Sequence, residues 1–297
     1  MKHSGLNDKL FDMIAIIISG LLLIITLYPL IYVLSASFSD PVIVTKGELW
    51  LLPKGLTLDG YKAIFDYKPI WVGYRNTLFY SVFGTVISLV FTLPCAYALS
   101  RHDMKGRNII MFLFLFTMFF NGGMIPTYLA MKQFGLLNTV WAVLIPGAVG
   151  VSNLIIARTY FANSVPWEIQ EAAIVDGCSN TRLFLAIVLP LSMPMVAVLT
   201  LYAFVYQWNQ FFNALIYLSD SNLYPLQLYL RNILLMDQMN ALLEGDSEAM
   251  QALLERIQLK ESMKYGIVVV STLPVLIIYP FLQKYFAKGV MMGAIKG

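Results

Sequence analysis

Neutral polar and aromatic side chains recur along one apolar stretch of this 297-residue chain. Their spacing of four, three and four residues places them on one face of a helix, and the residues are Tyr202, Tyr206, Asn209 and Asn213. Hydroxyl and amide groups hydrogen-bond neutral hydroxylated molecules, and aromatic rings stack on the C–H faces of sugars. A second interpretation stays open, in which these side chains only hydrogen-bond neighbouring apolar helices.

A second polar segment interrupts another apolar run. Residues 119–128 contain two glycines and Pro126 between Asn121 and Tyr128. An interrupted helix in an apolar environment is tolerated where its freed backbone groups line a cavity or meet protein partners. The candidates for a translocation path or substrate site are therefore Asn121, Tyr128, Tyr202, Tyr206 and Asn209.

A third segment, residues 164–190, has the pattern of a short helix between two elbows. Ser164 can cap such a helix, and Pro166 suits its first turn. Gly177 can adopt the left-handed conformation that ends it. Any of the residues 179–181 then offers a cap for a following helix. The pattern predicts a rigid helix of about three turns.

The middle of that helix has side chains suited to contact with another protein. Ala172 and Ala173 leave little bulk, so a partner surface can approach the backbone closely, and Glu171 adds a charge there. A short, rigid helix that projects on short connections can transmit force between two chains. We therefore expect Glu171, Ala172, Ala173, Asp176 and Gly177 to couple this chain to a partner.

The elements that position these residues are membrane helices. Hydrophobic residues make up 59% of the chain and charged residues 12%, against about 45–50% and about 25% in soluble domains. A bilayer core of about 30 Å needs roughly 20 apolar residues for each spanning helix. Six runs without Asp, Glu, Lys or Arg meet or nearly meet that length: 13–39, 76–100, 108–131, 133–157, 183–219 and 265–283.

The charges of the loops predict the orientation. The seven-residue loop 101–107 contains Arg101, Lys105 and Arg107, and such density in short loops marks the cytoplasmic side. We expect a multi-pass protein of the bacterial cytoplasmic (inner) membrane with both termini in the cytoplasm. The predicted segments are a cytoplasmic N-terminus (1–12), spans at 13–38, 76–100, 108–131, 133–157, 187–209 and 265–284, extracellular loops at 39–75 and 210–264, a cytoplasmic coupling loop at 158–186 and a cytoplasmic tail at 285–297.

The second outer loop contains an amphipathic pattern. Residues 248–257 carry an apolar stripe at helical spacing, made of Met250, Leu253, Leu254 and Ile257. The stripe fits a helix packed on the outer membrane surface, and it equally fits a docking platform for an extracellular partner.

The sequence excludes several sources of energy and chemistry. The span cores hold no ionisable residue of the kind that proton or ion pathways use. No phosphate-binding G-x-x-x-x-G-K-[ST] loop occurs. Two histidines and two cysteines cannot form a common metal site, and no basic cluster suggests nucleic acid. We expect a transport subunit, not an enzyme, that is powered by another chain.

The spacing Glu171-Ala-Ala, Gly177, Ile187-x-Leu-Pro190 resembles the EAA loop of bacterial ABC importer permeases. Trp208-Asn209 and the tail 289–297 are similar to the carbohydrate branch, especially to permeases for oligosaccharides and complex-polysaccharide fragments. The resemblance implies an all-α type I importer fold with six transmembrane helices and a cytoplasmic coupling helix.

The resemblance also implies partners. These are a second permease subunit, expected to be different from this one, two cytoplasmic ATPases that hold ATP and Mg²⁺, and an extracellular solute-binding protein. This chain itself is expected to contact membrane lipid and to bind no cofactor. An importer permease for peptides or amino acids is the alternative, since the coupling loop is shared across importer types. An ion-coupled carrier, or a membrane enzyme whose carboxylates or metal ligands are missing here, fits the sequence less well.

Overall fold

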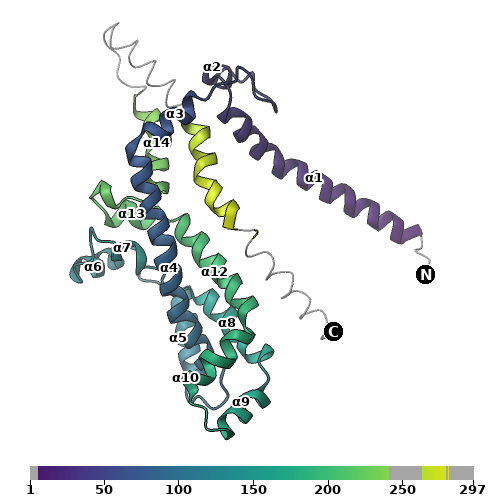
Figure 1. Ribbon diagram of the computed structural model, residues 1–297, viewed down its shortest axis with the longest axis vertical. Helices are drawn as coiled ribbons and strands as arrows, with labels where there is room; N and C mark the ends of the chain where they lie inside the picture. The colour runs from purple at the N-terminus through teal and green to yellow at the C-terminus, as the bar shows by residue number, and fades with distance from the viewer. Residues whose placement is uncertain (1–5, 241–262, 279, 281–297) are drawn as a thin grey trace. The chain divides into compact units, whose positions relative to one another are not determined.

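The computed structural model describes residues 6–240, 263–278 and 280 (Figure 1). Every regular element in these residues is helical, which agrees with the predicted all-α class. The described residues divide into two compact units, 6–68 with 230–240 and 263–273, and 69–229 with 274–278 and 280. Each unit is described by itself.

The first unit contains the longest exposed apolar helix. Helix α1, Leu6–Ser37, continues through Pro29, and its apolar side chains from Leu10 to Leu34 are largely exposed. Short helices α2, Pro41–Thr45, and α3, Asp59–Asp66, follow it. The unit also contains the first part of a further helix, Met263–Ile278, as far as residue 273. The ring of Tyr265 on that helix packs edge-on against Tyr32 of α1, beside the small core of Ala36, Val44 and Leu49.

The second unit begins with α4, Lys68–Ser100, which starts eight residues before the predicted span at 76–100. Helix α5, Arg107–Phe119, and helix α6, Met124–Gln133, are bent by 112° relative to each other. The predicted span 108–131 is therefore two helices. Gly123 adopts a positive φ of 82°, and its N–H donates to the side chain of Asn121, so local turn geometry replaces the helix.

The predicted span 133–157 is interrupted in the same way. Helix α7, Trp141–Leu144, is short, and helix α8 occupies Val151–Ser164. Between them Gly147 has a φ of 80°. Asn138, at a φ of 57°, accepts hydrogen bonds on Oδ1 from the N–H groups of Ser219 and Asp220. This side chain ties the loop before α7 to the loop after a later helix of the same unit.

The remaining helices contain a second sharp bend. Helix α9, Trp167–Val175, is followed by α10, Asn180–Leu183, a π-helix at Phe184–Val188 and α11, Leu189–Leu191. Helix α12, Met193–Trp208, leaves this segment at 85°. The unit ends with α13, Phe212–Tyr217, a 3₁₀ turn at Ser221–Leu223 and the start of α14, Leu226–Asn240. Prolines at 190 and 194 lack the N–H that would continue the helix through this bend.

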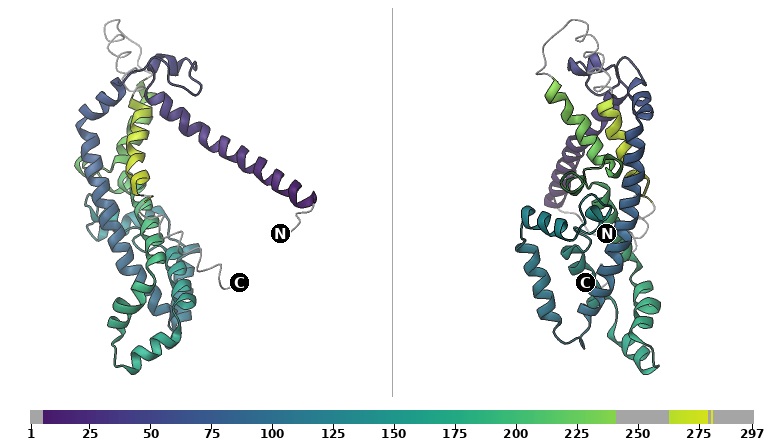
Figure 2. Two further views of the ribbon diagram at one scale, coloured as in Figure 1. Left: turned by 45° about the vertical axis from the view of Figure 1, so that its right-hand side comes forward. Right: turned by 90° about the vertical axis from the view of Figure 1, so that its left-hand side faces the viewer.

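A shared apolar core holds one end of this unit together. Side chains of α4, α8, α9, the π-helix and α12 meet there, and its buried members include Leu93, Tyr97, Leu154, Phe161, Ala173, Phe184, Val188 and Leu199. Both views of Figure 2 show α9 at this extremity of the unit. The core therefore fixes the base of α9 against α4 and α8.

The apolar helices account for part of the predicted membrane topology. Among the described residues, two helices are long and apolar enough to cross a bilayer, Lys9–Ser37 and Lys68–Ser100, and the two bent pairs raise the number to four if each is one span. The six-span arrangement stays a prediction. The amphipathic stripe at 248–257 and the tail at 285–297 lie outside the described residues.

Candidate functional site

A cavity of about 300 Å³ lies within the second unit. It is bounded by α4, the loop between α7 and α8, α8 itself and α12. The lining residues carry no formal charge, and they are Gly84, Ser88, Gly147, Gly150, Asn153, Tyr202, Ala203, Tyr206 and Gln207. Such a concave site with a few convergent polar groups is the usual form of a small-molecule site.

Two glycines shape this cavity by letting large side chains approach the backbone. A Cβ atom at Gly84 would lie 2.6 Å from Gln207 Nε2, and one at Gly147 would lie 2.6 Å from the hydroxyl of Tyr206. Gly147 also needs its positive φ. Glycine at these positions thus sets where Tyr206 and Gln207 lie.

The polar atoms of the cavity suit a neutral ligand. Gln207 is 3% exposed, and within the described part of the chain its Oε1 has no hydrogen-bond partner. A buried unpaired carbonyl is costly, so it is ready to accept a hydrogen bond from a hydroxyl. Tyr202 and Tyr206 are half exposed and offer rings for stacking. The arrangement can bind a hydroxylated ring without recognising charge.

The structure brings together only two of the five predicted path residues, Tyr202 and Tyr206. Asn209 terminates α12, where its amide donates to the carbonyl of Val205. The helix ends there, so the predicted shared face does not continue to Asn213, which belongs to α13.

The other two predicted path residues also lie outside the cavity lining. Asn121 occupies the break before α6, and the ring of Tyr128 stacks on that of Tyr217. Sequence reasoning missed Gln207, Ser88 and Asn153. Each of them is a polar residue inside an otherwise apolar run, and that was the signal that could have found them.

The short helix predicted within residues 164–177 corresponds to α9, with a different beginning. Ser164 is the last residue of α8, and α9 starts directly after Pro166 without a side-chain cap. Pro166 thus lies just before the first turn. Ser164 was wrongly expected to cap this helix, because α8 continues through it.

The end of α9 follows the expected geometry. Gly177 has a φ of 74°, its N–H donates to the carbonyl of Ile174, and the N–H of Cys178 donates to that of Ala173. These bonds pair the last carbonyls of the helix. Ser179 is the residue that caps α10, because its Oγ accepts from the N–H of Arg182.

The outward face of α9 combines apolar and acidic groups. Val175 is 86% exposed, and Glu171, Ala172 and Asp176 are exposed as well. Ala173, in contrast, is buried in the core of its own unit. Of the two alanines expected to meet a partner, Ala172 is exposed, whereas Ala173 packs inward.

No metal centre can be assigned from the described residues, since no three His, Cys, Asp or Glu side chains gather there. The two cysteines in this part of the chain, Cys95 and Cys178, are free thiols.

Comparisons with known proteins give one consistent result. Residues 69–292 match the family described as binding-protein-dependent transport system inner membrane component. Protein LplC of Bacillus subtilis (strain 168) is 38% identical over 99% of this chain and 98% of its own length. The polygalacturonan/rhamnogalacturonan transport system permease protein YtcP of the same organism is 39% identical over 98% of this chain and 100% of its own length.

A solved structure shares the fold. It is described as the crystal structure of a bacterial ABC transporter involved in the import of the acidic polysaccharide alginate. It superimposes with a TM-score of 0.84 at 36% identity and covers 96% of this chain and 100% of its own chain. The match over residues 69–292, together with the relatives that align along nearly the whole chain, shows that the chain belongs to the binding-protein-dependent transport system inner membrane components.

Proposed function

We propose that this chain is a permease subunit of an ATP-driven importer for oligosaccharides or polysaccharide fragments. It forms half of the translocation path, and a second, different permease subunit forms the other half. Two cytoplasmic ATPases supply the energy and hold ATP and Mg²⁺, while this chain binds no cofactor. An extracellular binding protein delivers the sugar. The chain crosses the membrane six times, with both termini in the cytoplasm.

The observation that carries the sugar assignment is the uncharged cavity of the second unit. Two half-exposed tyrosine rings and the amide side chain of Gln207 line it, and rings and amides match the C–H faces and hydroxyls of a sugar ring. Two relatives are transport system permease proteins for polygalacturonan/rhamnogalacturonan and for arabinooligosaccharides, which supports the same substrate class.

The coupling role rests on α9. Its outward face offers Val175 as an apolar contact, with the carboxylates of Glu171 and Asp176 beside it. We infer that this face docks into a cleft of an ATPase, and that closure of the two ATPases moves α9 and with it the spanning helices. Glu171, Ala172, Ala173, Asp176 and Gly177 form the coupling segment in this proposal.

A substrate panel tests the proposed function. The complete complex is reconstituted in liposomes, and the stimulation of ATP hydrolysis by the loaded binding protein is measured with uronide fragments, neutral oligosaccharides, amino acids and short peptides. We expect stimulation and ATP-dependent uptake with one of the two sugar classes alone. Stimulation by peptides or amino acids without any response to sugars would contradict the proposal. Uptake by the permease subunits without the ATPases would also contradict it.

A further inference from the structure

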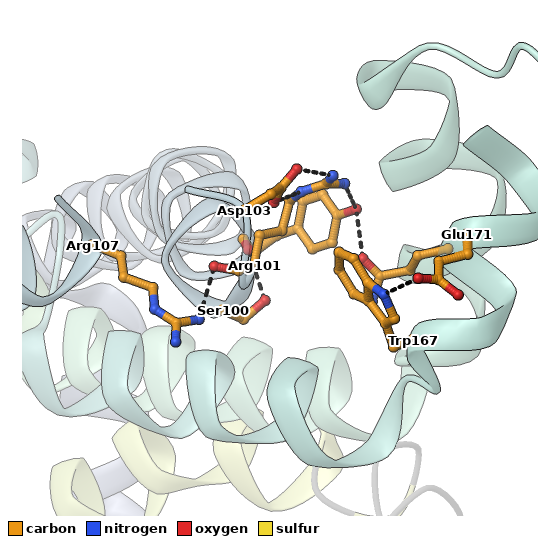
Figure 3. A network of polar contacts seen from close by, with 8 residues as sticks. Ser100, Arg101, Asp103, Arg107, Trp167 and Glu171 are labelled. Carbon is orange, nitrogen blue, oxygen red and sulfur yellow. Dashed lines mark hydrogen bonds and ion pairs between the residues drawn. The ribbon is translucent and has the colours of Figure 1, made fainter. Parts of the chain in front are cut away.

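The first residue after α4 is an arginine that is almost completely buried beside α9. Arg101 is 8% exposed. Its Nε donates to Oδ1 of Asp103 over 2.8 Å, its Nη2 donates to Oδ2 of the same carboxylate, and its Nη1 donates to the hydroxyl of Tyr97 over 3.1 Å. Figure 3 shows this guanidinium between the loop after α4 and the helix that carries Trp167 and Glu171.

The partners of Arg101 on α9 lie on one helix face. Its guanidinium carbon is 5.7 Å from the ring centroid of Trp167, a distance suited to a cation–π contact. The hydroxyl of Tyr97 also donates to Oε1 of Gln170 over 3.4 Å. Trp167, Gln170 and Glu171 are three and four residues apart, and neighbours at this spacing share a face. Arg101 thus contacts α9 directly and through Tyr97.

The contact reaches the acidic residue of the coupling segment. The indole N–H of Trp167 donates to Oε1 of Glu171 over 2.7 Å. The ring of His102 packs edge-on against Trp167, so two residues of the loop after α4 orient the indole. The exposed carboxylate of Glu171 is therefore held by a ring that Arg101 positions.

The end of α4 is itself firmly held. Nη1 of Arg107 on α5 donates to the carbonyl of Arg101 over 2.9 Å, and Nε of Arg158 on α8 donates to the carbonyl of Leu99 over 3.1 Å. Cationic donors at a helix C-terminus satisfy its unpaired carbonyls and stabilise its dipole. Because these hydrogen bonds fix the C-terminal end of α4, a displacement of α9 would move α4 as well.

We propose that Arg101 is a positioning residue for the coupling helix: it joins α4 to α9 and holds Trp167 and Glu171 in the orientation that the partner ATPase meets. The inference rests on the proposed function of α9. In this proposal, movement of α9 reaches α4 through the side-chain contacts of Arg101 as well as through the backbone connections at each end of α9.

The charge of this contact is present at physiological pH. The hydrogen bonds from Arg101 hold the pKa of the Asp103 carboxyl below its usual value of 3.8, and the hydrogen bonds to Asp103 raise the pKa of Arg101. The pair therefore stays ionised at neutral pH, and its contribution is lost only as the pH falls through the lowered pKa of Asp103.

The test compares three variants in the full reconstituted complex. Arg101→Met removes the guanidinium. Arg101→Lys keeps the positive charge but removes the planar guanidinium that can donate two parallel hydrogen bonds to a carboxylate. Lys105→Met removes one positive charge from an exposed position of the same loop. We expect Arg101→Met to lower sugar-stimulated ATP hydrolysis and uptake about tenfold, the loss expected for one charge-assisted contact. Basal ATP hydrolysis and assembly should be retained, Arg101→Lys should be intermediate, and Lys105→Met should resemble the wild type.

A double variant separates positioning from simple stability. Trp167→Phe keeps a ring over the guanidinium and removes the N–H donor to Glu171. If Arg101 acts through Trp167, Arg101→Met with Trp167→Phe should be no worse than Arg101→Met alone, because the two changes break one chain of contacts. Additive losses, or equal loss of basal and stimulated activity, would overturn the inference. If the wild-type complex takes up sugar and the Arg101→Met complex does so equally well, this inference alone is refuted. If the wild-type complex shows no ATP-dependent uptake of sugar, the proposed function is refuted.

Discussion

Gly177→Pro should abolish ATP-dependent sugar uptake and the stimulation of ATP hydrolysis in a complex that still assembles. Gly177 has a φ of 74°, and its N–H donates to the carbonyl of Ile174. Proline fixes φ near −65° and has no N–H, so the C-terminal turn of α9 cannot form. The outward face would then lose its fixed orientation. Uptake into liposomes and co-purification of the subunits are the two measurements.

A matched glycine provides the control for this variant. Gly47 has a φ of 72°, and its N–H donates to the carbonyl of Val44 after α2, so Gly47→Pro imposes the same local strain away from α9. It should keep most of the uptake. Gly177→Ala should have a partial effect, because nothing lies within 4 Å of the added Cβ and only backbone strain of about 1–2 kcal/mol remains. Full uptake with Gly177→Pro in an assembled complex would contradict the coupling role of α9.

Gly147→Val is expected to have the second largest effect. The added side chain would meet the hydroxyl of Tyr206, which lies 2.6 Å from the Cβ position, and would displace that ring within a cavity of about 300 Å³. Loss of one sugar contact worth about 1–3 kcal/mol corresponds to a loss of about 5-fold to about 150-fold in apparent affinity. The measurement is the sugar concentration that gives half-maximal uptake.

Gly135→Val is the matched control for the cavity. Gly135 also has a positive φ, 66°, and nothing lies within 4 Å of a Cβ atom there, so the variant carries the backbone strain without filling the cavity. Its half-maximal sugar concentration should stay near that of the wild type. If Gly147→Val and Gly135→Val behave alike, the sugar does not use this cavity.

The local signals in the sequence predicted the end of helix α9, but neither its first residue nor its inward face. Gly177 marked the end of α9, because a positive φ at that point strongly favours glycine. The direction of Ala173 was not predictable, since two adjacent alanines carry no periodic pattern that distinguishes the buried residue. Only the packing of α9 on α4 and α8 decides it.

Apolar runs without charges predicted the end of the long apolar helix α4 but not the breaks within the later runs. Helix α4 ends at Ser100, as the charge-free run predicted. The runs at 108–131 and 133–157 conceal turns at Gly123 and Gly147, because composition does not reveal which glycines take a positive φ. The sequence predicted only some of the residues that line the cavity. Tyr202 and Tyr206 share a helix face, whereas Gln207 joins them only because Gly84 admits its amide.

The most direct test of the central claim is the accessibility of Val175 at the exposed face of α9. Val175→Cys is introduced together with Cys95→Ala and Cys178→Ser, and a membrane-impermeant maleimide is added to intact cells and to inverted membrane vesicles. We expect labelling in inverted vesicles stripped of the ATPases, protection when the ATPases are bound, and no labelling in intact cells. Labelling in intact cells would contradict it, because α9 would then face away from any cytoplasmic source of energy.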